Sequence, residues 1–461
     1  DHSTPESYLS TIAARPVSSP LTTVGDGKGT MRYIPDEGRI VLSASDLKAA
    51  AECELAWLRA IDAKLGRVAP VDDPADATLE RAGRLGTEHK QRVLESYRDV
   101  FGPAVAEIPE TSSADAGGLA AAVEATRVAL ADAAMRVVYQ AAFATPDFVG
   151  FADFLVRDDA GRWIVQDSKL ARHARVTALM QLAAYADQLD RLGVPRSSRV
   201  ELLLGDGTTS THESADLMPV FRLRRERLRA LVADRHVEAG AEHPAIAWGD
   251  PRGELGVVAC GRCATCDLEV VASRDLLLVA GMRPVQRERL RAAGIASIDA
   301  LATATAPPAR MSADTFAMLR TQARLQLASP AGVPVPAVVP AAPVPVGAPV
   351  TATALADAAT VAAPAAAPAV PTYEVVLPTA LGALPRPDHG DIFFDFEGDP
   401  LYTEGPAREW GIDYLFGWVD DREQYSALWA HSFAEERVAL ETFLDLVALR
   451  RSPHPGMHIY H

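Results

Sequence analysis

Residues 150–170 read GFADFLVRDDAGRWIVQDSKL, the pattern of two short strands joined by a tight turn in DDAGR. Asp153 lies on the first strand, and Asp167 and Lys169 lie near the end of the second. Side chains two residues apart on a strand share a face, so Asp167 and Lys169 point the same way, and an antiparallel partner can place Asp153 beside them. The stretch therefore predicts two carboxylates and an ammonium group at one edge of a sheet.

Such a group of charges suits a divalent metal ion. Mg²⁺ prefers one or two carboxylates, with waters and substrate phosphate completing its shell. A metal of this kind makes a nucleophile from water and neutralises charge on a phosphoryl group, and a nearby lysine stabilises the transition state or orients the water. Asp153 and Asp167 are therefore candidate ligands for Mg²⁺ or Mn²⁺, and Lys169 is a candidate catalytic residue.

Composition predicts a chain of several globular domains. Its 461 residues, 48% of them hydrophobic, allow about three domains with buried cores. The net charge of −16 argues against coating nucleic acid through bulk charge, although a local basic surface can still hold a phosphate backbone. No apolar run reaches the roughly 18 to 20 residues of a membrane span and no signal peptide is evident, so we expect a cytoplasmic protein without a membrane partner. A start at Asp1 and a strand-like end predict a fragment.

Shifts in composition divide the chain into five segments. They are a flexible N-terminus (1–37), a mixed α/β domain (38–272), a small helical module (273–328), a Pro/Ala-rich linker (329–372) and the start of a second α/β domain (385–461). In the first domain, apolar spacing predicts helices over about 43–66, 76–98, 115–135, 176–193 and 219–240, and a further strand over 199–207.

The hairpin resembles the core of PD-(D/E)xK nucleases, and within that superfamily the RecB-like nucleases. Asp153 in GFAD matches their metal-binding acid, and Asp167 and Lys169 in QDSKL match the D-x-K element. The resemblance implies a restriction-endonuclease-like core, a mixed sheet flanked by helices. It also implies metal-dependent hydrolysis of DNA, as single strands or duplex ends.

Two flanking helices extend the resemblance. Gln181 and Tyr185 in QLAAY match the Q-x-x-x-Y helix that follows the core in RecB-like members, and their spacing places both on one helical face. His89 in GTEHKQR matches the helical histidine that precedes the core and, in relatives, contributes to metal binding. The resemblance therefore adds Gln181 and Tyr185 as catalytic residues and His89 as a metal ligand.

The four cysteines suggest a second metal centre. Cys53 precedes the hairpin, and Cys260, Cys263 and Cys266 follow it in CGRCATC. So few cysteines do not suggest a disulfide framework, whereas four thiolates suit an iron–sulfur cluster or zinc. Some RecB-like nucleases hold a [4Fe-4S] cluster with one cysteine before the core and three after it, so the resemblance implies that cluster. Zn²⁺ is the alternative.

The second half of the chain offers weaker patterns. Asp395 and Glu397 in FFDFEGD resemble the first motif of RNase H-like, DEDD-type exonucleases, whose D-x-E binds metal. The later motifs of that family are absent from the chain, so a partial domain, inactive by itself, is expected. The segment 277–302 weakly resembles a helix-hairpin-helix module that binds DNA phosphates. Arginines crowd another segment, at Arg222, Arg224, Arg225, Arg227 and Arg229, and suggest a local basic surface.

These patterns predict a metal-dependent deoxyribonuclease with a structural [4Fe-4S] cluster, acting in DNA repair, recombination or defence. The domain order resembles bacterial RecB-family proteins in which a helicase domain follows. No GxxxxGKS motif occurs in the chain, so a helicase would lie downstream. One alternative is a noncatalytic nucleic-acid-binding module that loads DNA for a helicase or nuclease partner. Another is an interaction scaffold with a zinc site.

Overall fold

The computed structural model describes most of the chain outside its N-terminus and linker. The described residues are 31–71, 76–113, 115–238, 243–249, 255–329, 372–404 and 409–461. Nearly all of the linker predicted over 329–372 lies outside them, as do residues 1–30 of the predicted flexible N-terminus. The chain divides into two compact units between Asp275 and Leu276. In the described residues, none of the helices combines the length and apolar character needed to cross a bilayer.

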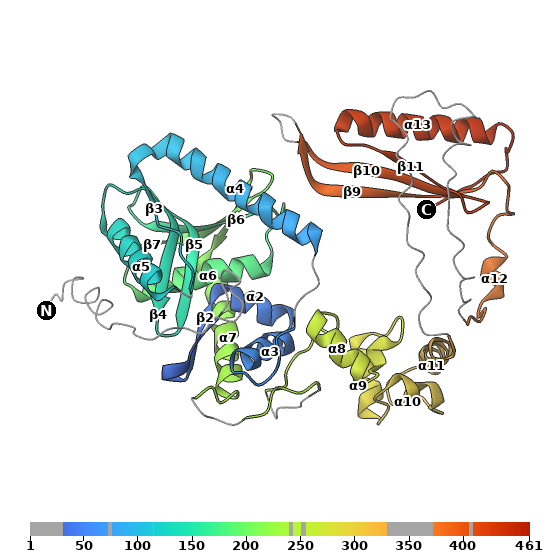
Figure 1. Cartoon of the computed structure of the whole chain (residues 1–461), viewed down its shortest axis with the longest axis horizontal. Coiled ribbons are helices and arrows are strands. Elements are labelled where there is room, and N and C mark those ends of the chain that lie inside the picture. The colour runs from blue at the N-terminus through green and yellow to red at the C-terminus, as the bar shows by residue number, and fades with distance from the viewer. Residues whose placement is uncertain are drawn as a thin grey trace. The chain divides into compact units, whose positions relative to one another are not determined.

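The first unit is built on an eight-stranded mixed sheet (Figure 1). Its main path runs through β1 (Arg32–Ile34), β2 (Arg39–Ser43), β5 (Phe148–Arg157), β6 (Trp163–Lys169), β7 (Arg196–Leu204) and β8 (Thr209–Glu213). Off this path, β4 (Val137–Thr145) pairs with β5, and β3 (Val105–Glu107) pairs with β4. The predicted mixed sheet is confirmed. The boundary at residue 37 is wrong, because β1 lies before it and pairs with β2.

The predicted hairpin is confirmed as β5 and β6, which pair antiparallel. Its turn is held by Asp158, whose carboxylate accepts hydrogen bonds from the backbone N–H groups of Ala160 (3.0 Å) and Arg162 (2.8 Å). Gly161 adopts a φ of 76° there, a conformation that glycine enters without a steric cost. Trp163 begins a run of six buried residues, as expected for a strand covered on both faces.

Seven helices of at least nine residues accompany this sheet in the described part of the first unit. They are α2 (Ala44–Glu52), α3 (Glu54–Lys64), α4 (Ala77–Phe101), α5 (Ala116–Ala131), α6 (Val176–Arg191), α7 (Ser214–Ala233) and α8 (Ala264–Ala272). The predicted helices are present, with shifted ends in several cases. The first is divided at Cys53, and α7 begins five residues before the predicted Pro219. Helix α8 was not predicted.

The two faces of the sheet carry different helices. Val137 and Phe154 pack with Leu94 of α4 in one hydrophobic cluster. Their neighbours Val138 and Leu155 belong to the main core, which also contains buried residues of α5 and α6. Because side chains alternate along a strand, α4 covers one face while α5 and α6 cover the other. The sheet is therefore a layer between helices.

The second unit contains the helical module and a separate sheet. The module comprises α9 (Pro284–Ala292), α10 (Ile298–Thr303) and α11 (Ala313–Ala328), which share a small core around Leu290, Leu301 and Leu319. Gly294, at φ 82°, lies in the turn between α9 and α10. The expected short helices are present, and DNA binding by the module stays a prediction.

The C-terminal part of this unit is a four-stranded sheet with the order β11-β10-β9-β12. Its elements are α12 (Pro378–Leu381), β9 (Ile392–Glu404), β10 (Glu409–Asp420), β11 (Tyr425–Trp429), α13 (Phe433–Arg451) and β12 (Ile459–Tyr460). Phe443 of α13 stacks on Phe394 at 4.0 Å between ring centroids and lies 5.7 Å from Trp418. Helix α13 thus covers one face, in agreement with the expected α/β character.

Candidate active site and metal centre

Strand β5 changes partners along its length and so creates a fork in the sheet. Its first residues, Phe148 and Val149, pair with β2, and its last residues, from Phe154 onward, pair with β6. Strand β6 pairs with β7 from Trp163 to Lys169, and beyond the Phe154–Gln166 pair this is the pairing that continues, with Asp167 opposite Leu202. Residues 150–153 and 167–169 therefore face each other where the two strands diverge. We refer to this place as the fork.

The fork brings together the three charged residues of the hairpin. The backbone N–H of Ser168 donates a hydrogen bond to Oδ2 of Asp153 across the gap (3.1 Å), and Nζ of Lys169 lies 2.7 Å from Oδ2 of Asp167. Both aspartates are only 7% exposed. Two nearly buried carboxylates and a lysine therefore occupy one small volume, as the spacing predicted, while their catalytic role stays a prediction.

Burial and nearby charges shift the pKa values of the two carboxyls in opposite directions. Burial, reinforced by the Asp153 carboxylate, raises the pKa of Asp167 to about 7 against the opposing effect of Lys169. Burial alone would also raise the pKa of Asp153, but Lys90 and Lys169 hold it below its usual value. Like charges that share a low-dielectric site cannot both ionise freely. Positive charge close to the pair therefore stabilises its ionised form.

Two residues at the fork were missed by the sequence analysis. Nζ of Lys90, on α4, lies 2.7 Å from Oδ1 of Asp153, and Nε2 of Gln140, on β4, donates to the same oxygen at 3.1 Å. Lys90 directly follows His89, so its nearness to the matched histidine was the available signal. Gln140 adopts a φ of 56°, and no sequence pattern indicated this backbone conformation.

His89 is buried on α4, and its Nε2 lies 3.1 Å from the backbone oxygen of Leu203 on β7. The contact fixes α4 to the strand next to β6. Further along the same helix, Tyr97 donates to Oε1 of Gln166 at 2.6 Å. The helix is therefore anchored on both sides of Lys90, and a metal-binding role for His89 stays a prediction.

Gln181 and Tyr185 both lie on α6, but in different surroundings. Tyr185 is buried between Phe143 and Phe148, with both ring-centroid distances 6.0 Å. Burial, followed by the nearby charges of Asp167 and Asp153, raises its pKa. Gly150 leaves room for its ring, since a Cβ there would lie 3.0 Å from Tyr185 Cε1. Tyr185 thus packs behind the fork.

Gln181 instead lines an open pocket of about 530 Å³ between α2, the end of β6 and the start of α6. Lys169 lines the same pocket, whereas neither aspartate of the fork is among its lining residues. Polar and charged side chains surround it, including Lys48, Glu52, His173 and Arg175. The pocket therefore gives a solvent-borne substrate access to Lys169, beside the buried carboxylates.

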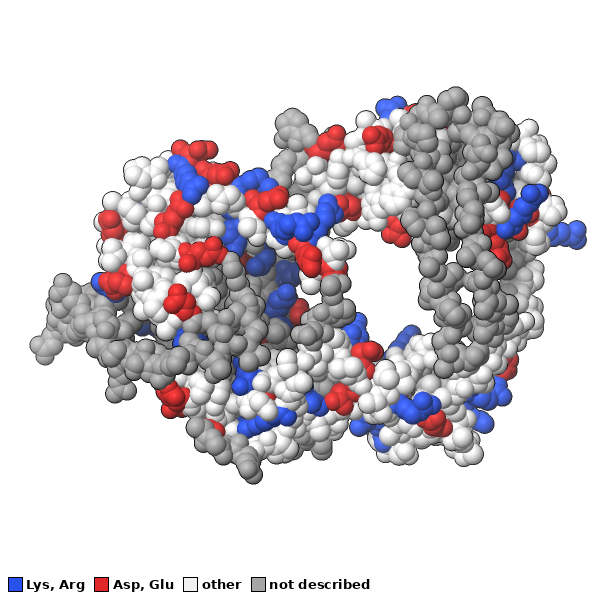
Figure 2. Space-filling model, in the orientation of Figure 1, with Lys and Arg blue, Asp and Glu red and all other residues white. Residues whose placement is uncertain are grey.

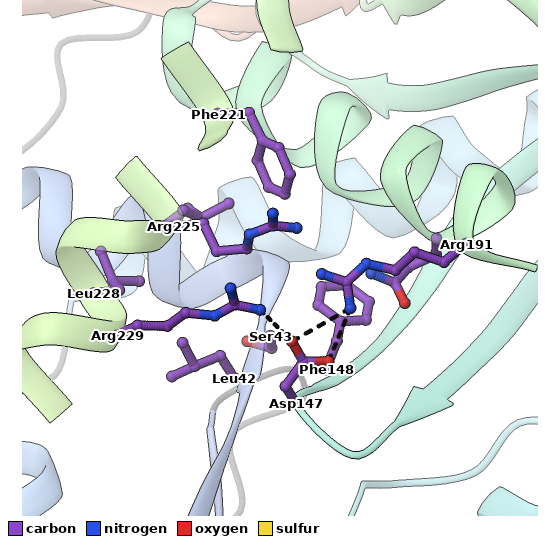
Figure 3. Close-up of a pocket in the computed structure, with 11 residues that line it drawn as sticks. Leu42, Ser43, Asp147, Phe148, Arg191, Phe221, Arg225, Leu228 and Arg229 are labelled. Carbon is purple, nitrogen blue, oxygen red and sulfur yellow. Dashed lines mark hydrogen bonds and ion pairs between the residues drawn. The ribbon is translucent and has the colours of Figure 1, made fainter. Parts of the chain in front are cut away.

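A second, much smaller pocket of about 20 Å³ lies where α6 and α7 meet the β4–β5 turn. Figure 3 shows Arg191 and Arg229 converging on Asp147, where Arg191 makes a 3.0 Å ion pair. Arg225 pairs with Asp187 at 2.6 Å. Arg191 and Arg229 thus tie α6 and α7 to the turn, and Arg225 ties α7 to α6.

The arginine-rich segment is thus only partly available to nucleic acid. Arg227 also points inward, to both carboxylate oxygens of Glu54 (2.9 and 2.7 Å), while Arg222 and Arg224 are exposed. On the visible face, Figure 2 shows basic and acidic residues interspersed rather than gathered by sign. The local basic surface suggested for this segment is reduced, because Arg225, Arg227 and Arg229 pair with Asp187, Glu54 and Asp147.

All four cysteines meet in one cluster, as their pattern predicted. Their sulfur atoms lie within 4.8 Å of one another, with 3.5 Å between Cys53 and Cys266 and 3.9 Å between Cys260 and Cys266. A tetrahedron of about 2.3 Å metal–sulfur bonds has edges of about 3.8 Å. The cluster can therefore hold a metal ion.

Cys53 does not lie within a helix, contrary to the prediction. Its backbone is extended (φ −162°, ψ 107°) between α2 and α3, and its sulfur caps α3 by accepting the N–H of Ala56 at 3.4 Å. The neighbouring Glu54 accepts the N–H of Val258 at 2.9 Å. The break turns Cys53 toward the CGRCATC segment, which Glu54 and Arg227 hold in place.

The sulfur environment favours a thiolate at Cys53, whereas burial raises the pKa of Cys263, and the hydrogen bond to Cys53 together with burial raises that of Cys266. The hydrogen bond from Cys266, with backbone N–H donors from Cys260 and Ala56, lowers the pKa of Cys53 to about 5 against the effect of burial. Backbone N–H groups of Arg262 and Cys263 also point at Cys260 Sγ, at 3.5 and 3.3 Å. Metal ligation requires the deprotonated thiol, so these donors suit a metal–thiolate centre.

Asp395 and Glu397 lie together on β9 but are both exposed. Oδ1 of Asp395 accepts the backbone N–H of Phe396 at 2.9 Å. In the described residues, the cysteines form the group of three or more potential ligands whose donor atoms lie close enough for one ion; Asp395 and Glu397 do not belong to it, and neither do Asp153, Asp167 and His89. Metal binding by this pair stays a prediction.

Comparison with known families places a match over the first unit. Residues 41–269 match the model of the PD-(D/E)XK nuclease superfamily. The matched span contains the fork, the helices α4 (with Lys90) and α6 that lie beside the fork, and all four cysteines. No curated protein matches the chain.

Proposed function

We propose that residues 41–269, a PD-(D/E)XK nuclease superfamily domain, form a metal-dependent deoxyribonuclease of the RecB-like type. The observation that carries the proposal is the fork, where two buried carboxylates meet Lys169 beside an open polar pocket. Nothing in the packing of the domain requires this costly concentration of charge. A role in DNA repair, recombination or defence is part of the same proposal.

The residues of the fork fit a divalent cation. Oδ2 of Asp167 is buried beside Nζ of Lys169 (2.7 Å), and Oδ1 of Asp153 lies 2.7 Å from Nζ of Lys90, so both carboxylates already interact with positive charge. Asp153 and Asp167 would hold Mg²⁺ or Mn²⁺, with a main-chain carbonyl of Val165 or Gln166 and His89 as further candidate ligands. When bound, such an ion acidifies a water and offsets charge on the phosphoryl group.

The chain's own residues supply orientation and charge. Lys169 lies at the boundary between the carboxylates and the open pocket, where its ammonium can orient the attacking water and stabilise charge developing on phosphorus. Gln181, on the pocket wall, would contact the nucleic-acid strand. Tyr185 packs against Phe148 and would keep α6 in register with β5.

The direct test is cleavage of end-labelled single-stranded and duplex DNA with Mg²⁺ or Mn²⁺. We expect products from the wild-type chain and from Lys64→Ala, an α3 substitution away from the fork, but none from Lys169→Ala. A wild-type protein as inactive as Lys169→Ala would contradict the proposal. Unchanged DNA binding by an inert wild type would favour the noncatalytic loading module.

We also propose that the cysteine cluster holds a structural metal. The sulfur separations of 3.5 and 3.9 Å fit a single tetrahedral ion such as Zn²⁺. They do not fit a [4Fe-4S] cluster, because its thiolates bind different irons of a cube and must stand farther apart. Metal analysis and visible absorbance of anaerobically purified protein distinguish the two: a colourless protein with one zinc supports the single ion, and a brown protein with four irons contradicts it.

For the C-terminal sheet we propose the start of an RNase H-like domain. Support comes from β9, β10 and β11 in an antiparallel meander, followed by α13 and by β12 parallel to β9. Asp395 and Glu397 would then be metal ligands of a complete domain. A Mn²⁺ titration of the chain with and without Asp395→Asn tests this, since two exposed carboxylates should give weak binding that the variant lacks.

A further inference from the structure

Helix α4 brings to the fork a second lysine that the D-x-K pattern does not include. Nζ of Lys90 lies 2.7 Å from Oδ1 of Asp153, and Nζ of Lys169 lies 2.7 Å from Oδ2 of Asp167. Each buried carboxylate thus has its own ammonium group, and the four formal charges cancel. With both lysines in place, the fork is already electrically balanced.

A divalent ion cannot join this arrangement without displacing a cation. Asp153 already accepts hydrogen bonds from Gln140 on Oδ1 and from the Ser168 N–H on Oδ2. Both donors are neutral and can remain beside a metal, whereas the ammonium of Lys90 would repel it at close range. The side chain of Lys90 is 29% exposed, against 9% for that of Asp153, so it approaches from the solvent side.

Lys90 can leave without disturbing the helix that carries it. His89 holds α4 to the backbone oxygen of Leu203, and Tyr97 holds it to Gln166. Lysine has a flexible four-carbon stem and a compact charge that re-pairs readily with phosphate. Its head group can therefore move while the metal ligands keep their positions.

We propose that Lys90 is a metal-exchangeable counter-ion: it neutralises Asp153 while the fork holds no divalent ion, and metal binding releases its ammonium to contact the substrate phosphate. The inference rests on the proposed nuclease function and adds a residue outside the D-x-K element. Lys90 is thus a positioning residue that links metal loading to nucleic-acid binding.

Mn²⁺ titration of the full chain without DNA, followed by electron paramagnetic resonance, tests the first half. The relevant signal is the binding that Asp167→Asn removes, which sets aside Mn²⁺ held elsewhere. Lys90→Met should bind Mn²⁺ at this site about tenfold more tightly than wild type, because no buried ion pair has to be broken. Lys64→Met, the same substitution on α3, should bind like wild type.

Binding of a fluorescent single-stranded oligonucleotide in Ca²⁺ tests the second half. Here Lys90→Met should bind several-fold more weakly than wild type, since the released ammonium is missing. Tighter Mn²⁺ binding together with weaker DNA binding is a pair of opposite changes that general damage to the fold would not produce.

The outcomes separate this inference from the function on which it rests. Mn²⁺ binding by Lys90→Met that is equal to or weaker than that of wild type would overturn the role of Lys90. So would unchanged oligonucleotide binding. If Asp167→Asn binds as much Mn²⁺ as wild type, the metal site at the fork is itself wrong, and the proposed nuclease function fails with it.

Discussion

Two pairs of acidic residues in this chain share a similar strand context and have very different surroundings. Asp153 and Asp167 at the fork are each 7% exposed and have lysine partners at 2.7 Å. Asp395 and Glu397 on β9 are exposed to solvent. A carboxylate in water gains little from binding a cation, whereas two carboxylates crowded in a low-dielectric site gain much. Burial, more than the sequence motif, distinguishes the first pair as the proposed metal site.

The largest expected difference between the two pairs is in catalysis. Asp167→Asn should lower DNA cleavage by about a thousandfold or more, because it removes a metal ligand from the transition state. Asp395→Asn should change the rate less than about twofold, within the range of ordinary surface substitutions. Initial rates on end-labelled DNA in Mg²⁺ measure both. Equal losses in the two variants would mean that burial does not distinguish the pairs.

The cysteine cluster joins segments of the first unit that are far apart in the sequence. Removing one cysteine tests whether the stability of that unit depends on this link. Cys53 and Cys260 lie 207 positions apart, so a shared metal restrains a very long loop. We expect Cys266→Ser to destabilise the first unit by about 4 kcal/mol. The C-terminal sheet has its own core and should unfold as before.

Differential scanning calorimetry can separate these effects. The expected result is one transition that moves to lower temperature in Cys266→Ser and another that stays in place. A uniform shift of the whole profile, or none at all, would contradict a structural role confined to the first unit.

The pH dependence of stability gives a finer comparison. Because burial and Asp153 raise the pKa of Asp167 to about 7, the folded protein retains a proton there that the unfolded chain releases near its ordinary pKa of about 4. This contribution to stability is present below pH of about 4 and is lost as pH rises through about 7. Asp167→Asn should lack this pH dependence. Its free energy of unfolding, relative to that of wild type, should therefore rise by about 2 kcal/mol between pH 5 and 8.

Urea unfolding at the two pH values, without added Mg²⁺ or Mn²⁺, measures that gain. Glu397→Gln provides the exposed counterpart and should change the free energy of unfolding by less than about 0.5 kcal/mol. A variant at Asp167 that follows wild type across the whole range would show that the carboxyl is not perturbed in the folded protein.

The smallest expected effect is at a half-exposed ion cluster, whose burial is intermediate between those of the two acidic pairs. Asp147 is 40% exposed at its side chain and pairs with Arg191 and Arg229. Arg229→Gln removes one of two cations and should cost about 1 kcal/mol or less, because solvent screens the pair and Arg191 remains. Thermal unfolding measures the loss, and DNA cleavage should be unaffected. A loss as large as that from Cys266→Ser would argue for a buried, unscreened network instead.

Local patterns were sufficient to predict the hairpin and the meeting of its charged residues. The apolar run from Trp163, the turn at Gly161 and the two-residue spacing of Asp167 and Lys169 are all encoded within one short stretch. The cysteine cluster was predictable for a different reason, since thiols with this spacing have few other uses. In both cases the chemistry depends on residue type and spacing alone.

Contacts between distant segments were not predictable in this way. Lys90 and Gln140 reach Asp153 only because α4 crosses the sheet and β4 pairs with β5. The extended backbone at Cys53 depends on the partner segment near Val258, which lies 204 positions from Glu54. Arg227 turns inward because that same Glu54 is buried. Each of these depends on tertiary packing, which overrides local propensity.

The position of Mn²⁺ in crystals soaked with that ion is the most direct measurement. We predict an anomalous-difference peak within about 2.2 Å of carboxylate oxygens of both Asp153 and Asp167, with Lys90 moved away from Asp153. A peak at Asp395 and Glu397 with none at the fork would contradict the assignment of the buried pair as the metal site.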